Sequence, residues 1–140
     1  MVEHFLEAQD NGVYERALSE IKSGQKKSHW MWFIFPQIAG LGHSPTAKYY
    51  AIQNREHAEE YWNNPILRKR LIEISQAVYD LNAANIADVF GYPDYLKFQS
   101  CMTLFKYIAP DETVFTMNLR RYFREEPCVH TKSFYKGVAI

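Results

Sequence analysis

The residues best suited to bind a ligand occur in one aromatic-rich segment. His29 precedes Trp30 and Trp32, and Gln37 follows the same run of apolar residues. Indole rings can stack on a flat ring, and a neighbouring histidine can act as an acid, a base or a phosphate contact. This pattern is typical of a pocket for a nucleobase or a nicotinamide ring. It is equally typical of aromatic core packing in which His29 only forms a local cap or hydrogen bond.

A second group of candidate residues lies later in the chain. Lys97 and Ser100 are three residues apart, so they share one face of a predicted helix, beside an apolar stripe of Phe98, Cys101 and Phe105. A cation and a hydroxyl at the edge of an apolar face suit an anionic ligand, although a solvated helix edge has the same pattern. We predict one ligand pocket built by both segments and lined by His29, Trp30, Trp32, Gln37, Lys97 and Ser100.

Other chemistry has little support in the sequence. The glycines of segment 40–44 lack the third glycine of a dinucleotide-binding fingerprint, so a turn into a helix at Pro45 is preferred. Cys101 is expected in the core, and Cys128 with His130 two residues later is poorly spaced for a catalytic pair. The histidines show no metal-binding spacing. We therefore assign no catalytic residue and predict no metal site and no cofactor.

Composition restricts the class of protein. The chain has 140 residues, of which 47% are hydrophobic and 16% aromatic, which excludes a disordered chain and suits one domain. Its 16 basic and 16 acidic residues give zero net charge, which disfavours a dedicated nucleic-acid coat, although local basic clusters leave room for a patch.

The same survey gives an expected location. The longest apolar run, Trp30 to Phe35, is far shorter than the roughly 20 residues that cross a membrane. The first residues are acidic, unlike a secretion signal, and the two cysteines form no close pair. We therefore expect a cytoplasmic protein without a membrane partner.

The elements expected to position these side chains are helices. Asn64 and Asp94 are predicted N-caps, and Pro65 suits a first helical turn. The segment from Trp30 to Phe35 is predicted as a short helix capped by Ser28, because no second strand is available to pair with it. Apolar spacings of three and four predict further helices over 13–21, 54–62, 65–81, 94–108 and 111–123. The fold class is thus all-α, a single compact multi-helix domain over residues 1–140 with an irregular tail from about residue 125.

Segment 27–37, followed by Gly40-Leu41-Gly42, resembles the signature of a bacterial family catalogued as domain of unknown function 1810 and sometimes mislabelled calpastatin. The resemblance covers nearly the whole chain and includes segments 5–9, 14–18 and 102–105. It implies a mainly α-helical domain with no established activity. Relatives sometimes occur beside macrodomains, which handle ADP-ribose, and this implies nucleotide or ADP-ribose chemistry. The chain departs from the pattern at Cys101, where a serine is usual, and in segment 124–128, which lacks the usual glycine and aspartate.

Two functions remain open at this point. The first is the binding of a small nucleotide-like or ADP-ribose-like anion by the aromatic segment together with the Lys97 and Ser100 face. The alternative is a helical module that binds a protein or RNA without catalysis and uses the aromatic residues only as core. The arrangement of the polar residues separates these functions, because a binding domain requires them to line a concave pocket. No protein partner follows from the sequence.

Overall fold

The computed structural model describes residues 1–135, with side chains up to Lys132, and its secondary structure is helical. The first five helices are α1 (Glu3–Gln9), α2 (Val13–Lys22), α3 (Met31–Ile34), α4 (Pro45–Tyr49) and α5 (Arg55–Asn63). The others are α6 (Pro65–Leu81), α7 (Ile86–Phe90), α8 (Asp94–Ile108), α9 (Val114–Phe123) and α10 (Val129–Tyr135). Within residues 1–135 there is no strand, and the one isolated β-bridge joins Ile38 to Ile52. The all-α prediction is confirmed.

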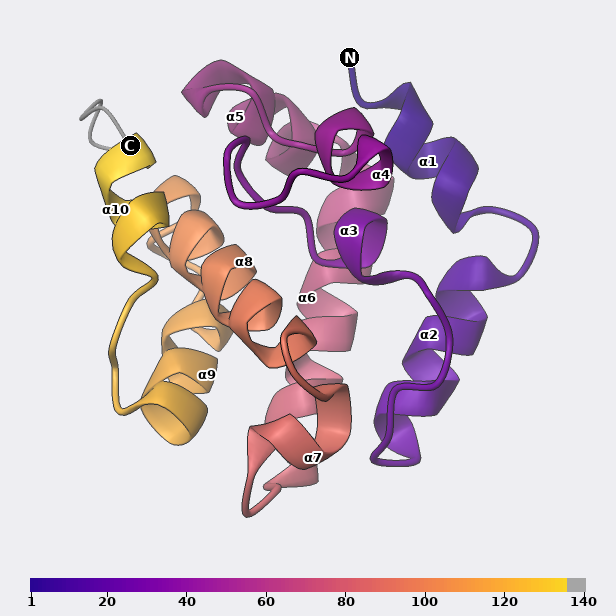
Figure 1. Cartoon of the computed structure of the whole chain (residues 1–140), viewed down its shortest axis with the longest axis vertical. Helices are drawn as coiled ribbons and strands as arrows, with labels where there is room; N and C mark the ends of the chain where they lie inside the picture. The colour runs from indigo at the N-terminus through magenta and orange to yellow at the C-terminus, as the bar shows by residue number, and fades with distance from the viewer. Residues whose placement is uncertain (136–140) are drawn as a thin grey trace.

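Helix α6 forms the centre of the fold. It packs against α2, α5 and α9, and Figure 1 shows α2 and α9 on opposite sides of it. Its buried apolar residues recur every three or four positions, which gives the helix one continuous core face. These residues are Leu67, Leu71, Ile74 and Val78. Helix α8 forms the second layer of contacts, against α5, α7, α9 and α10.

Asn64 caps α6 as predicted. Its Oδ1 accepts hydrogen bonds from the backbone N–H groups of Ile66 and Leu67, both at 3.1 Å, and Pro65 occupies the first turn. Replacing Asn64 with alanine leaves these N–H groups without a protein acceptor, and we expect a loss of about 1 kcal/mol in the free energy of unfolding. Urea denaturation measures this loss. Asn63→Ala, at the exposed neighbouring position, should change stability by less than about 0.5 kcal/mol, and equal losses would contradict the capping role.

The predicted N-cap of α8 is wrong by one residue, and the predicted start of α9 is wrong by three. Pro93, not Asp94, is the N-cap residue of α8, and Asp94 is the first helical residue. Its carboxylate pairs with lysine side chains instead of capping the helix. Helix α9 begins after Thr113, so Asp111 lies outside it.

The aromatic segment forms a short helix, as predicted, but without the predicted cap. Trp30 is the N-cap residue of α3, and the structure records no side-chain hydrogen bond at this cap. The hydroxyl of Ser28 donates instead to Glu20 Oε2 at 2.6 Å. The hydroxyl of Ser28 thus donates to a charged carboxylate. Hydrogen bonds to charged groups are stronger than the neutral bonds of a helix cap.

The predicted irregular tail is wrong for residues 129–135, which form α10. This helix packs on α8, where Thr131 is fully buried and its hydroxyl lies 2.8 Å from that of Ser100. The contact joins two polar side chains, so it leaves no apolar periodicity in the sequence. That absence explains why the pattern after Phe123 did not reveal the helix.

Candidate ligand-binding site

A cavity of about 430 Å³ lies beside the aromatic segment and α8. Its lining includes Trp32, Gln37, Lys97 and Ser100, four of the six residues predicted to form a pocket. The remaining lining residues come from the loop after α3, from α8 and its N-terminal end, and from the C-terminal segment: Leu41, Gly42, Pro93, Leu96, Gln99, Cys128 and His130. The structure thus brings together residues distant in the chain around one hollow, which we name the larger cavity.

His29 and Trp30 lie at a separate, smaller cavity of about 110 Å³. Trp32 and Lys97 line this smaller cavity as well as the larger one, so these two side chains form a shared wall. The other lining residues of the smaller cavity are Lys26, Met31, Phe33, Thr46 and Asp94. The predicted pocket is therefore divided into two compartments.

Gln37 is a buried polar side chain at the larger cavity with a single long hydrogen bond. It is 1% exposed, and its amide nitrogen makes one long hydrogen bond, 3.4 Å, to the carbonyl oxygen of Phe35. No donor among the described residues reaches its amide oxygen. Its backbone is fixed, since its carbonyl accepts from the N–H of Ile52 at 2.8 Å. Buried polar groups normally have partners, so this amide is available to a ligand that offers both a donor and an acceptor.

Asp94 links two lysines beside the shared wall. Its carboxylate oxygens lie 2.9 Å from Lys26 Nζ and 2.9 Å from Lys97 Nζ. Burial raises the pKa of Asp94, but the two ammonium groups outweigh burial and hold the pKa below its ordinary value. Two cations and one carboxylate leave one net positive charge. Lys97 is the more exposed lysine, at 22% against 9%, so it presents this charge to the cavities.

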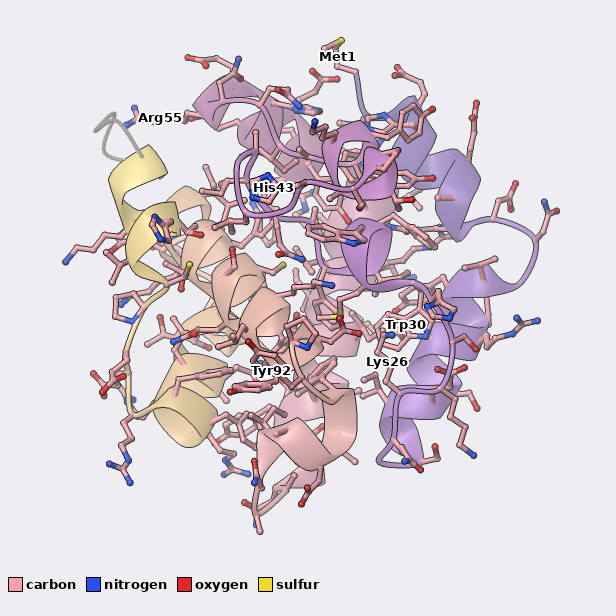
Figure 2. The ribbon with its side chains drawn as sticks, in the orientation of Figure 1. Met1, Lys26, Trp30, His43, Arg55 and Tyr92 are labelled. Atoms are coloured by element: carbon pink, nitrogen blue, oxygen red, sulfur yellow. The ribbon has the colours of Figure 1, made fainter. Side chains whose placement is uncertain are left out.

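Each lysine of this triad lies over an indole ring. Lys97 Nζ is 4.6 Å from the ring centroid of Trp32, and Lys26 Nζ is 5.1 Å from that of Trp30. Figure 2 labels Lys26 and Trp30, which lie close together in that view. Such contacts attract the cation to the ring face. Trp30 is 1% exposed and part of the core, whereas Trp32 is half-buried. Only Trp32 therefore offers an accessible ring to a ligand.

Glu20 of α2 fixes the chain that leads into α3, and the sequence analysis missed it. Its carboxylate accepts from the backbone N–H groups of Lys27 and Ser28, from the Ser28 hydroxyl and from Trp30 Nε1, at 2.6–2.9 Å. Burial raises the pKa of Glu20, but these four donors outweigh burial and lower it to about 2. The partners are seven to ten residues away, so no helical spacing marks this residue.

Gly42 allows Trp32 to pack tightly. A Cβ at this position would lie 2.6 Å from Trp32 Cη2 and 2.7 Å from the Cβ of Ala47. We therefore expect Gly42→Ala to displace the indole ring and to lower the free energy of unfolding by about 1–2 kcal/mol. Tryptophan fluorescence and urea denaturation measure both effects. The smaller ring of Trp32→Phe should relieve the clash, so strictly additive losses in the double variant would contradict the proposed contact.

Ser100 serves the site by holding its C-terminal wall. Its hydroxyl pairs with that of Thr131 at 2.8 Å, so it is already occupied. Two further hydrogen bonds attach the same segment to α8: the N–H of Cys128 to Thr103 Oγ1 at 2.9 Å, and Gln99 Nε2 to the carbonyl of Glu126 at 2.9 Å. These bonds bring Cys128 and His130 to the larger cavity. Cys101, in contrast, is fully buried, and burial raises the pKa of its thiol.

One missed residue had a signal in the sequence. Leu96 lines the larger cavity and is 41% exposed, which is unusual for a leucine on a packed helix. It precedes Lys97 and lies four residues before Ser100, so helical spacing places all three on one side of α8. Cys128 and His130 had no such signal, because their segment lacks periodic apolar residues.

Among residues 1–135, no group of three His, Cys, Asp or Glu side chains is arranged to hold a metal ion. No helix in that range combines the length and the apolar character needed to cross a membrane.

Comparisons with known proteins agree with the fold. A family model described as "Protein of unknown function (DUF1810)" matches residues 1–135. The crystal structure of the conserved hypothetical protein Rv1873 from Mycobacterium tuberculosis is similar, with a TM-score of 0.92, 36% sequence identity and 96% of each chain covered. No match was found among the curated proteins.

Proposed function

Because the chain belongs to the DUF1810 family, whose description names no activity, we propose a function from its geometry. The larger cavity binds the planar ring of a small nucleotide-like or ADP-ribose-like anion. The observation that carries this proposal is the buried amide of Gln37, whose oxygen has no donor among the described residues. A base edge or a carboxamide offers the matching donor and acceptor.

Three further features support a planar anion. Trp32 provides a half-buried ring for stacking, and Leu41, Pro93 and Leu96 add apolar lining. Lys97 supplies positive charge at the same wall. The combination of a mostly apolar hollow with few polar groups is typical of small-molecule sites. Hollows of about 440 and 530 Å³ elsewhere in the described structure are lined by other residues and have no comparable buried amide.

A thermal-shift screen with nucleosides, nucleotides, NAD and ADP-ribose tests this proposal. A ligand at about 100 times its Kd should add roughly 2.7 kcal/mol to the free energy of unfolding and raise the Tm. Gln37→Leu should still fold, because an apolar replacement removes a poorly partnered group, yet it should weaken binding about tenfold or more.

Gln53→Leu is the matched control, since Gln53 is exposed and lies outside the larger cavity. It should leave binding unchanged. Loss of binding in both variants would contradict a specific role for Gln37. A screen in which no compound raises the Tm would reject the proposal and favour the alternative, a helical module that binds a protein or RNA.

A further inference from the structure

We infer that the smaller cavity is the anion subsite of this ligand and accepts a single phosphate group. The ligand is then a phosphate monoester that carries a planar ring. The inference rests on the proposed function for the planar part, but it assigns a separate role to His29, Lys26, Lys97 and Thr46. These residues line a compartment that the planar part does not occupy.

The charges around the smaller cavity favour an anion. Lys26, Lys97 and Asp94 all line it, and their formal charges sum to one positive charge. Glu20 lines neither cavity, and its carboxylate is already bound by four hydrogen-bond donors. A bound oxyanion would compensate the positive charge of these three lining side chains.

The lining also supplies hydrogen-bond donors of the right type. His29 and Thr46 are exposed, and the imidazole and the hydroxyl have no hydrogen-bond partner among the described residues. An imidazole N–H, a hydroxyl and the Lys97 ammonium group can each donate to a phosphate oxygen. Charge-assisted bonds of this kind are about twice as strong as neutral ones.

Size and charge are both compatible with one phosphate group. The cavity volume of about 110 Å³ is large enough to hold a tetrahedral oxyanion. One net positive charge from the lining side chains is closer in magnitude to the charge of a phosphate monoester than to that of a diphosphate.

The two compartments lie on either side of a shared wall. Trp32 and Lys97 line both, so a ligand stacked on the Trp32 ring in the larger cavity has its polar end beside Lys97. The predicted ligand therefore places its ring against Trp32 and Gln37, and its phosphate on the side of His29. This arrangement gives His29 a role in ligand binding although it lies outside the larger cavity.

Calorimetric titration with adenosine, AMP and ADP, and with nicotinamide riboside and its 5′-monophosphate, tests the inference. In the wild type, each monophosphate should bind at least tenfold more tightly than its nucleoside, and higher salt should reduce this ratio. His29→Ala should reduce the ratio to about threefold or less without changing nucleoside affinity. Gln37→Leu should weaken nucleoside and monophosphate equally and leave the ratio unchanged.

His43→Ala is the matched control, because His43 is also exposed, lies in the loop before α4 and lines neither cavity. It should reproduce the wild-type ratio. Lys97→Gln should lower the ratio as His29→Ala does, and Lys27→Gln is its control, since Lys27 is an exposed lysine outside both cavities.

The outcomes separate the inference from the proposed function. Equal binding of nucleosides and monophosphates overturns the anion subsite and leaves the planar site standing. Tighter binding of ADP than of AMP overturns the single-phosphate assignment. If no planar compound binds but inorganic phosphate does, and His29→Ala abolishes it, the anion subsite stands and the proposed function fails. Failure of both inorganic phosphate and every planar compound to bind overturns both.

Discussion

Replacing Glu20 with alanine should lower the free energy of unfolding by about 3 kcal/mol. The carboxylate accepts four hydrogen bonds, and the alanine variant leaves the buried indole N–H of Trp30 and the N–H of Ser28 without an acceptor. Hydrogen bonds to charged groups contribute about 1.5–3 kcal/mol each, and partial exposure of the site reduces their sum. Urea denaturation followed by tryptophan fluorescence measures the loss.

The expected loss is specific to the contacts of Glu20. Glu59→Ala removes an exposed carboxylate from α5 and should change stability by less than about 0.5 kcal/mol. A loss at Glu20 no larger than this would show that the segment before α3 is held by other contacts.

The same carboxylate predicts how stability depends on pH. The pKa of Glu20 falls from 4.5 to about 2 on folding, because the donors to its carboxylate outweigh burial. Folding is therefore favoured by the ionised form, and this contribution is complete above pH 4.5 and is lost as the pH falls towards 2. Glu20→Gln cannot ionise, so its stability should decrease less over that range. Parallel decreases in wild type and variant would contradict the assignment.

Replacing Asp94 with alanine should have a similar effect, a loss of about 2–3 kcal/mol. Lys26 is 9% exposed, and the substitution removes the carboxylate that pairs with its ammonium group. Lys97 loses the same partner, so two cations then lie close together without an anion between them. Removing one partner of a fully buried ion pair lowers the free energy of unfolding by about 3–5 kcal/mol. We expect a smaller loss here because Asp94 is partly exposed. Thermal or urea denaturation measures the loss.

The triad can be tested from both sides. Lys97→Gln leaves the more deeply buried ion pair of Lys26 and Asp94 intact, so it should reduce the free energy of unfolding by less than about 1 kcal/mol. Asp111→Ala, at an exposed position before α9, should have almost no effect. If Lys97→Gln is as destabilising as Asp94→Ala, the asymmetry argued from exposure is wrong.

Asp94 also contributes to acid sensitivity. Burial raises its pKa, but Lys26 and Lys97 lower it by more, so folding favours the carboxylate. This stabilisation is present above the ordinary pKa of 3.8 and is lost as the pH falls through the lower folded value. The acid transition of Glu20→Gln should therefore be reduced but not abolished.

Local patterns were sufficient for the elements that depend on local contacts. The stripe from Leu67 to Val78 predicted α6, and Asn64 with Pro65 predicted its start, because capping and helical periodicity act over a few residues. The three-residue spacing of Lys97 and Ser100 on one helix is a local pattern of the same kind, and both residues line the larger cavity. In each case the physical cause lies within one or two helical turns.

The parts that could not be predicted depend on polar contacts between distant segments. Lys26 and Asp94 meet only when α2 and α8 are folded, and nothing in their neighbouring residues distinguishes them from solvated charges. The hydroxyl pair of Ser100 and Thr131 likewise holds α10 without an apolar stripe. Division of the pocket depends on the position of the Trp32 ring, which is set by contact with Gly42 rather than by sequence spacing.

The two free cysteines differ in exposure, so a thiol reagent should distinguish them in the folded protein. Cys101 is fully buried and burial raises its pKa, so it is protected from alkylating reagents while the fold is intact. Cys128 is half-exposed and lines the larger cavity. A thiol-reactive fluorophore should therefore attach at one defined position without mutagenesis. The label would report occupancy of the cavity through its own spectrum, and delayed labelling at Cys101 would report opening of the core.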